Sequence, residues 1–371
     1  MAPPPAASPA RAAALRRRLL AWWDAGHREL PWRFPQGAAD PYRVWLAEVM
    51  LQQTRVEAVI PRYRAFLSRW PTLEALAAAP EADLLAAWSG LGYYARCRNL
   101  AAAARQALRL HGGLPASIEA LLDLPGFGPY TAGAVASIAF AIPAAAVDGN
   151  AARVLARLFG LRGDPGERRY RDRLWELARR LAGEGRRPAL ARPGDLNQAL
   201  MDLGATVCGR TPSCGRCPLT PLCRARSLGL TGRLPVPQPG AKRRRLVLAC
   251  AVIERRGRVL LARRSGGLFA GMLGFPSADA RGRGARAALC SELAGMGVRA
   301  RAGRRLASVD RVLTHRVLRL VAYACSVDGR PPRGKRLSWT AWGELERVGL
   351  PTAMRALAAA VCEGRSPSLR G

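Results

Sequence analysis

Lysine, histidine and long apolar runs are what this sequence of 371 residues has least of. Its only lysines are Lys242 and Lys335. The chain before Lys242 therefore has no lysine amine that could form a Schiff base with a substrate. No stretch is long and apolar enough to span a membrane, and no secretory signal precedes the cysteines.

Acidic residues are scarce as well. Asp and Glu number 26 against 59 Lys and Arg, which gives a formal net charge of +33. A solvated basic surface without a partner is the alternative, but an excess of this size favours a polyanionic partner, with nucleic acid first. Hydrophobic residues make up 49% of the chain, enough for a sizeable core and for two or more domains.

The nine cysteines do not form the dense framework of a secreted domain, which indicates a reducing cytosol with thiolates free to bind metal. Cys208, Cys214, Cys217 and Cys223 are separated by gaps of five, two and five residues. A zinc ribbon more often has two distant CxxC pairs. One central CxxC flanked by single cysteines fits a four-iron cluster better. The other cysteines lack metal spacing and are predicted core thiols.

The stretch Leu121–Asn150 organises the helical part of the chain. It predicts a helix end, a tight turn and a second, apolar helix over Tyr130–Phe140. Gly126 and Gly128 allow positive φ and close backbone approach, and Pro129 suits a first helical turn. The free N–H groups of such a turn favour a phosphate.

Asp148 and Asn150 follow this second helix in the sequence VDGN. Taken alone, either residue is most simply an N-cap for a helix over Ala151–Phe159. The phosphate-binding turn upstream makes a functional role for the pair more probable than the capping pattern alone does.

Pro41 opens a predicted helix, PYRVWLAEVMLQQTRVEAVIPRY, with Glu48 in its middle. Apolar neighbours favour the protonated carboxyl, as a general acid near neutral pH requires. The alternative is a solvated stripe of Glu48, Gln52 and Arg55, and the helix alone favours it. The run Leu51–Thr54 nevertheless places polar amides beside the carboxyl, where the edges of DNA bases could be read.

Ser89–Tyr94, SGLGYY, interrupts the helices. It fits equally a helix end with packed rings and a loop that inserts a ring or Leu91 into a base stack. Further on, Thr231–Gly240 is rich in Pro and Gly and precedes the basic run Lys242–Arg245, which together predict an interdomain linker.

Past the linker the periodicity changes to that of a small α+β domain. Strands are predicted at Leu246–Ile253, Arg258–Ala262 and Val317–Cys325, and also near Trp339. Helices are predicted near Ala285–Ala294 and from Pro351 onward.

The sequence resembles the MutY-type adenine DNA glycosylases from about Trp22 to Leu357. The resemblance rests on the cysteine cluster and on LPWR (Leu30–Arg33), EVMLQQT (Glu48–Thr54), GLGYYAR (Gly90–Arg96), LPGFGPYTAGA (Leu124–Ala134) and VDGNAARVLAR (Val147–Arg157). It implies an all-α helix-hairpin-helix glycosylase core with an iron–sulfur cluster loop, and a C-terminal α+β Nudix-like domain. The expected division is a disordered leader (1–10), a cluster domain (11–40 and 141–230), a six-helix barrel (41–140), a linker (231–244) and the Nudix-like domain (245–362).

The resemblance also implies an activity: monofunctional removal, in base excision repair, of adenine paired with 8-oxoguanine or guanine in duplex DNA, by a monomer. Glu48 would protonate the leaving adenine, Asp148 would stabilise the sugar cation, and Tyr130 and Asn150 would assist. The expected DNA-contacting residues are Arg33 and Gln198 around adenine, Gln53, Leu91 and Tyr93 beside the opposite base, Gly126 and Gly128 at a phosphate, and Thr314 and His315 at 8-oxoguanine. Thr54 is expected to contact DNA as well. A 4Fe–4S cluster would be held by Cys208, Cys214, Cys217 and Cys223, although the first gap is one residue shorter than is usual in relatives.

Three rival interpretations fit less well. A bifunctional glycosylase/lyase of the endonuclease III type needs a lysine where this hairpin has Tyr130. A Nudix pyrophosphohydrolase needs a Glu-rich helix, and ARAALCSELAG offers only Glu292. A non-catalytic iron–sulfur protein that binds DNA does not need both Glu48 and Asp148.

Overall fold

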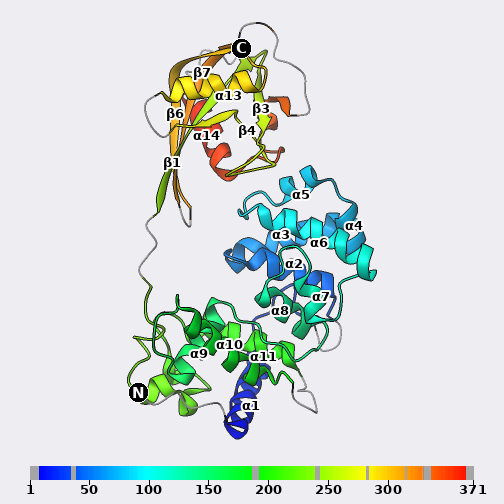
Figure 1. The fold of residues 1–371 in the computed structure, drawn as a ribbon, viewed down its shortest axis with the longest axis vertical. Helices are drawn as coiled ribbons and strands as arrows, with labels where there is room; N and C mark the ends of the chain where they lie inside the picture. Colours follow the sequence, from blue (N-terminus) through cyan, green and yellow to red (C-terminus); the bar gives the residue numbers. More distant parts are fainter. Residues whose placement is uncertain are drawn as a thin grey trace. The chain divides into compact units, whose positions relative to one another are not determined.

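The structure is a computed structural model that describes residues 8–34, 39–185, 192–238, 243–280, 284–313, 316–327, 329 and 336–364. It consists of two compact units (Figure 1). One comprises Met1–Ala78 and Asn99–Pro239, and the other Ala79–Arg98 and Gly240–Gly371. None of the described helices is long and apolar enough to cross a membrane. Thr314 and His315 lie outside the described residues.

The first unit is built from helices, as predicted. They are α1 (Pro9–Gly26), α2 (Pro41–Leu51), α3 (Val56–Arg69), α4 (Leu73–Ala78), α6 (Ala95–His111, which begins in the second unit), α7 (Ile118–Leu122), α8 (Pro129–Ala139), α9 (Gly149–Phe159), α10 (Arg168–Ala182), α11 (Pro193–Thr206), the short 3-10 turns η1 (Cys214–Arg216) and η2 (Thr220–Leu222), and α12 (Arg224–Ser227).

Helix α1 packs with α9, α10 and α11 although more than a hundred residues separate it from them in sequence. It begins at Pro9, two residues before the expected start, because the Ser8 hydroxyl caps it. Leu15 and Leu19 on its inner face join Phe159 and Leu203 in one buried cluster. This cluster extends to the cysteine loop, so α1 supports the chain segment that follows α11.

The single helix predicted from Pro41 onward is wrong, because the chain forms two helices there. Gln52 ends α2 with ψ at 116°, and Gln53 adopts a left-handed φ of 56°. The Thr54 N–H bonds back to the Leu51 carbonyl (3.2 Å), which closes a turn before α3 begins. Local hydrogen bonds of this kind compete with the helix and are not visible in a hydrophobic period. Because of this break, Gln52, Gln53 and Thr54 lie in a loop between α2 and α3 and not on the surface of a helix.

The hairpin turn before α8 has one left-handed glycine instead of two. Gly126 has φ of +80°, whereas Gly128 is extended (φ −106°) and serves as the N-cap residue before Pro129. A third glycine, Gly133, brings α8 against the following loop so closely that a Cβ there would lie 1.9 Å from the Ala145 carbonyl oxygen. The apolar helix therefore holds the chain that leads to the acidic loop.

The second unit contains two sheets. The strands are β1 (Arg244–Val252), β2 (Glu254–Arg255), β3 (Arg258–Arg263), β4 (Leu273–Gly274), β5 (Ser277–Asp279), β6 (Ala300–Val312), β7 (Arg316–Val327) and β8 (Leu337–Ala341), and the helices are α5 (Glu81–Ala87), α13 (Ala285–Gly295), α14 (Thr352–Glu363) and the 3-10 turn η3 (Trp342–Glu344). The larger sheet has the order β5–β1–β7–β6, and only β1 and β7 within it run parallel. In the other sheet, β3 pairs with β2, β4 and β8. The α+β prediction is confirmed, although β6 was not predicted.

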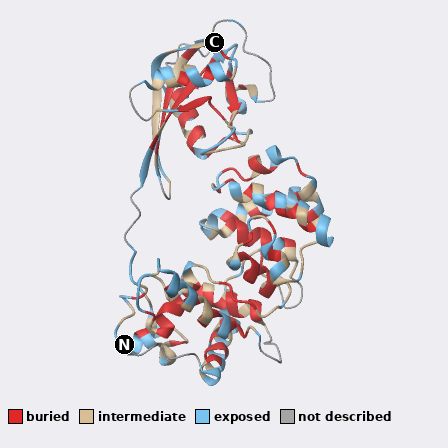
Figure 2. Ribbon diagram, in the orientation of Figure 1, coloured by how far each residue is buried: buried red, intermediate tan, exposed pale blue. Residues whose placement is uncertain are grey.

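The larger sheet has an apolar core on each face, and much of its ribbon is coloured as buried in Figure 2. Leu246 and Leu248 of β1 face a core that includes Leu357 of α14. Ala249 lies on the other face, in a core that includes Leu293 of α13. Because strand β1 is apolar on both sides over most of its length, the sequence shows a hydrophobic run there and not an alternation.

The segment Ala79–Arg98 belongs to the second unit although Asn99–Pro239, which separates it from the rest of that unit, belongs to the first. Buried Ser89 donates a hydrogen bond to the Leu350 carbonyl at 3.0 Å, and Arg98 donates to the Ala270 carbonyl at 2.6 Å. Nothing in the sequence predicted this arrangement, and the expected domain boundaries remain a prediction.

Candidate active site

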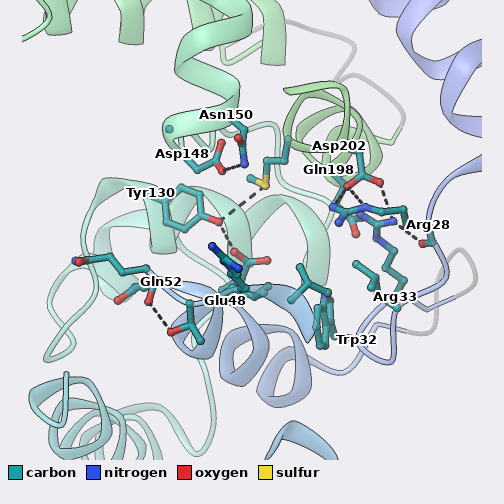
Figure 3. Close-up of a pocket in the computed structure, with 18 of the residues that line it drawn as sticks. Arg28, Trp32, Arg33, Glu48, Gln52, Tyr130, Asp148, Asn150, Gln198 and Asp202 are labelled. Atoms are coloured by element: carbon teal, nitrogen blue, oxygen red, sulfur yellow. Dashed lines mark hydrogen bonds and ion pairs between the residues drawn. The ribbon is translucent and has the colours of Figure 1, made fainter. Parts of the chain in front are cut away.

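A cleft of about 980 Å³ opens in the first unit (Figure 3). Helices α2, α8 and α11, the start of α9 and the loop before α2 contribute to it. Its lining includes most of the residues expected to carry chemistry, namely Arg33, Glu48, Gln53, Thr54, Tyr130, Asp148, Asn150 and Gln198. Residues far apart in sequence thus converge as the motifs predicted.

Glu48 lies on the buried face of α2 with 6% of its surface exposed. Burial raises the pKa of this carboxyl to about 7, and the nearby Asp148 adds to the rise. The Tyr130 hydroxyl donates a hydrogen bond to Glu48 Oε2, and this bond lowers the pKa of Glu48 and so offsets part of the rise. Glu48 is therefore not part of a solvated stripe, and it holds a proton near neutral pH.

Asp148 caps a helix and also lines the cleft. Its Oδ1 accepts the Ala151 N–H at 2.7 Å and so caps α9, while the side chain also faces the cleft. Burial raises the pKa of Asp148 above its ordinary range. The Ala151 N–H, the Asn150 side-chain amide (3.1 Å from Oδ2) and Arg153 act in the opposite direction. These donors favour the carboxylate at Asp148, whereas Glu48 has one donor.

Arg153 fixes Asn150 beside Asp148. Its guanidinium donates to Asn150 Oδ1 at 2.8 Å and to the Gly204 and Cys208 carbonyls at 2.7 and 2.8 Å. The first turn of α9 is thereby tied to the end of α11 and to the first cysteine. Arg153 was not predicted from the sequence, and its position one helical turn after Asn150 was the available signal.

A buried ion-pair cluster that the sequence analysis missed forms one wall of the cleft. Asp202 on α11 is 2% exposed and contacts two guanidinium groups, those of Arg28 and Arg33. Arg33 lies 2.9 Å from Asp202 Oδ2, donates to the Arg28 carbonyl, and stacks over Trp23 at 4.5 Å. Arg33 therefore has a fixed orientation toward the cleft. Asp202 follows Gln198 by one helical turn, which places both on one face of α11 and could have indicated it.

Leu91 and Tyr93 lie in the second unit and differ in exposure. Leu91 is 5% exposed, whereas Tyr93 is 40% exposed and has a left-handed φ of 48°. Tyr93 lines a separate cavity of about 570 Å³ together with Phe269 and Leu313, the residue next to Thr314. The exposed ring, and not the buried leucine, is available to a ligand in this conformation.

The four clustered cysteines line one small cavity beside α9 and are free, half-buried thiols. Arg157 donates to the Cys208 sulfur at 3.3 Å and to the Gly209 carbonyl at 2.6 Å. Within the described residues, no three His, Cys, Asp or Glu side chains converge on a point suited to a single metal ion.

Comparison with known proteins agrees with this geometry. Residues 46–180 match the HhH-GPD superfamily of base excision DNA repair proteins, and residues 248–360 match the NUDIX domain. The chain is 35% identical to an adenine DNA glycosylase of Rattus norvegicus over 95% of this chain and 79% of that protein. The chain belongs to the adenine DNA glycosylase family.

Other relatives support this assignment. An adenine DNA glycosylase of Mycobacterium tuberculosis is 39% identical over 65% of this chain and 76% of that protein. Among solved structures, a thermostable thymine-DNA glycosylase aligns with a TM-score of 0.51 at 30% identity, covering 60% of this chain and 99% of that one.

Replacing Asp202 by Asn tests the ion-pair cluster of this family member. The change keeps the shape of the side chain but leaves the buried Arg33 guanidinium without its counter-charge, so we expect a loss of roughly 3 kcal/mol or more in unfolding free energy. Asp24→Asn is the matched control, because Asp24 pairs with Arg192 at 49% exposure and should lose at most about 1 kcal/mol. Urea unfolding of the two variants would contradict the account if their losses were equal.

Proposed function

We propose that this protein removes adenine from duplex DNA by hydrolysing the N-glycosidic bond, without a lyase step. The observation that carries the proposal is the pairing, across one cleft, of a buried carboxyl whose pKa is raised to about 7 with a second carboxyl held by several hydrogen-bond donors. Glycosidic cleavage needs one group to give a proton and another to remain charged. Tyr130 occupies the hairpin position where a lyase would need an amine.

In the proposed reaction the bond between the sugar and the base breaks with its electrons moving to adenine. Glu48 transfers its proton to the departing base, which leaves neutral, and the sugar becomes an oxocarbenium-like cation. Asp148 stabilises this cation. The Glu48 carboxylate then takes a proton from the water that adds to the sugar. Tyr130 orients Glu48 through its hydrogen bond, and Asn150 orients Asp148.

The base reaches such a cleft only after leaving the duplex. Arg33 and Gln198 face the cleft and are proposed to contact adenine. The left-handed Gln53 and the neighbouring Thr54 occupy the cleft too and are proposed to fill the gap in the stack. The turn of Gly126 and Gly128 is proposed to bind a backbone phosphate, since the N–H groups at the start of α8 have no helical partner.

The opposite base is proposed to be 8-oxoguanine, or guanine with lower preference. The proposed contacts are Tyr93, Thr314 and His315, together with Leu91, which would have to leave its buried position to reach the base. The cavity supports this proposal, because it is lined by the exposed Tyr93 and by Leu313, the residue that directly precedes Thr314 in the chain. The Nudix-like domain thus discriminates the partner base and performs no hydrolysis.

We further propose that Cys208, Cys214, Cys217 and Cys223 hold a 4Fe–4S cluster. The residues fit such a group. All four thiols line one cavity, and each ligand of a cubane binds its own iron, so the four need not converge on one point. Arg157 donates to the Cys208 sulfur and supplies positive charge beside the thiolates. The cluster would hold the loop after α11 in place.

Glu48→Gln tests the proposed acid. The amide keeps the size of the side chain but cannot give the proton, so single-turnover adenine release from an A:8-oxoguanine duplex should fall by at least about 100-fold while duplex binding is kept. Glu74→Gln makes the same chemical change at an exposed residue of α4 and should leave the rate unchanged. Near-normal release by Glu48→Gln would refute the assignment.

Metal analysis of the purified protein tests the cluster. We expect brown protein with about four irons per chain, because one cubane contains that number. Cys214→Ser should lower iron content and folding yield more than the rate per folded molecule. Colourless, active protein that contains zinc would overturn the cluster proposal and leave the proposed glycosylase chemistry in place.

A further inference from the structure

Two arginines face each other at one end of the larger sheet in the Nudix-like domain. Arg244 begins β1 and Arg316 begins β7, and the parallel register pairs them directly. Both are exposed, and the exposed start of β1 is visible in Figure 2. Like charges in directly opposed positions destabilise a sheet. Sheet stability therefore does not explain why two arginines occupy this pair of positions.

The strand register places a third arginine on the same face. The next pair on that face, Leu246 and Leu318, is buried, and Arg311 of β6 pairs with Leu318. Arg244, Arg316 and Arg311, here called the arginine row, therefore border the apolar core covered by α14. They continue its face beyond the point where the core ends.

The opposite face of the same strand ends carries a carboxylate, that of Asp310, beside its arginines. Arg319 makes two hydrogen bonds of 2.8 Å to Asp310, and Arg245 also lies close enough to lower the pKa of Asp310. Within the described part of the chain, neither Arg244 nor Arg316 contacts a carboxylate. In the described part of these strand ends, the two faces thus differ: one has a carboxylate close to its arginines, and the face of Arg244 and Arg316 has none in contact with them.

The arginine row also adjoins the cavity that contains Tyr93. Arg316 lines this cavity together with Leu313, Phe269 and Tyr93. Each base in a duplex is covalently linked to a sugar and phosphate. If a base binds near Tyr93, its phosphate will therefore lie close to the protein strands that border the cavity. Arginine recognises phosphodiester oxygens through its planar array of donors.

We propose that the arginine row binds the backbone phosphates of the DNA strand that carries the base opposite adenine. This inference rests on the proposed function in taking duplex DNA as the substrate. The arginine row contributes binding affinity that does not depend on DNA sequence, and the residues near Tyr93 distinguish 8-oxoguanine from guanine. The Nudix-like domain would then hold the duplex with charge and read one base of it.

The test is the salt dependence of duplex binding, measured by fluorescence anisotropy in a Glu48→Gln background so that excision does not intervene. Each lost phosphate contact lowers the slope of log K against log salt by about 0.9. We expect Arg316→Ala to lower it by about that amount and Arg244→Ala with Arg316→Ala by about twice it, equally for A:8-oxoguanine, A:G and undamaged duplexes. Arg319→Ala, three residues along the same strand, is the matched control and should leave the slope unchanged.

Equal slopes for Arg316→Ala and the unsubstituted background would overturn the inference, and so would an equal loss in Arg319→Ala. The outcome is separable from that of the proposed function. Adenine release by the wild-type protein with no change of slope in Arg316→Ala would refute only the arginine row. If Arg316→Ala lowers the salt slope but the wild-type protein releases no adenine, only the proposed reaction is refuted.

Discussion

The site depends on the removal of one carboxyl from water. Glu48 lies on a helix face that packs into the first unit, and its raised pKa follows from that burial. Tyr130 satisfies one oxygen of the carboxyl, so the group is desolvated without being left unpaired. Asp148, beside it, receives donors from the start of α9. Two chemically similar groups are thereby given different environments, as acid and cation-stabilising roles require.

The remainder of the first unit keeps these environments fixed. Gly133 allows α8 to approach the acidic loop, and Arg153 ties the start of α9 to the cysteine loop. Asp202 fixes Arg28 and Arg33 on the opposite wall through ion pairs. Each device joins segments distant in sequence through a buried or half-buried contact. A cysteine loop with little secondary structure of its own is held by Arg153 and Arg157, which lie one turn apart on α9.

The sequence predicted the parts of the site that belong to short motifs, and the reasons are local. Asp148 was recognisable because capping residues and acidic loop residues share a pattern. Its capping role is confirmed, whereas its role in catalysis stays a prediction. Asp202 was not recognised, since its partners are 174 and 169 positions away and no periodicity encodes an ion pair of that kind. The break after Leu51 was missed because polar residues in a helical period give no sign of a left-handed Gln53. The association of Ala79–Arg98 with the Nudix-like domain depends on contacts that only the folded chain defines.

The pH dependence of adenine release under single-turnover conditions tests the central claim most directly. The carboxyl of Glu48 is the acid only while protonated, and its pKa is raised to about 7. The rate on an A:8-oxoguanine duplex should therefore be high below this pH and should fall about tenfold for each further pH unit well above it. A rate that stays constant from pH 6 to about pH 9, with binding unchanged, would contradict the assignment of Glu48 as a buried, protonated acid.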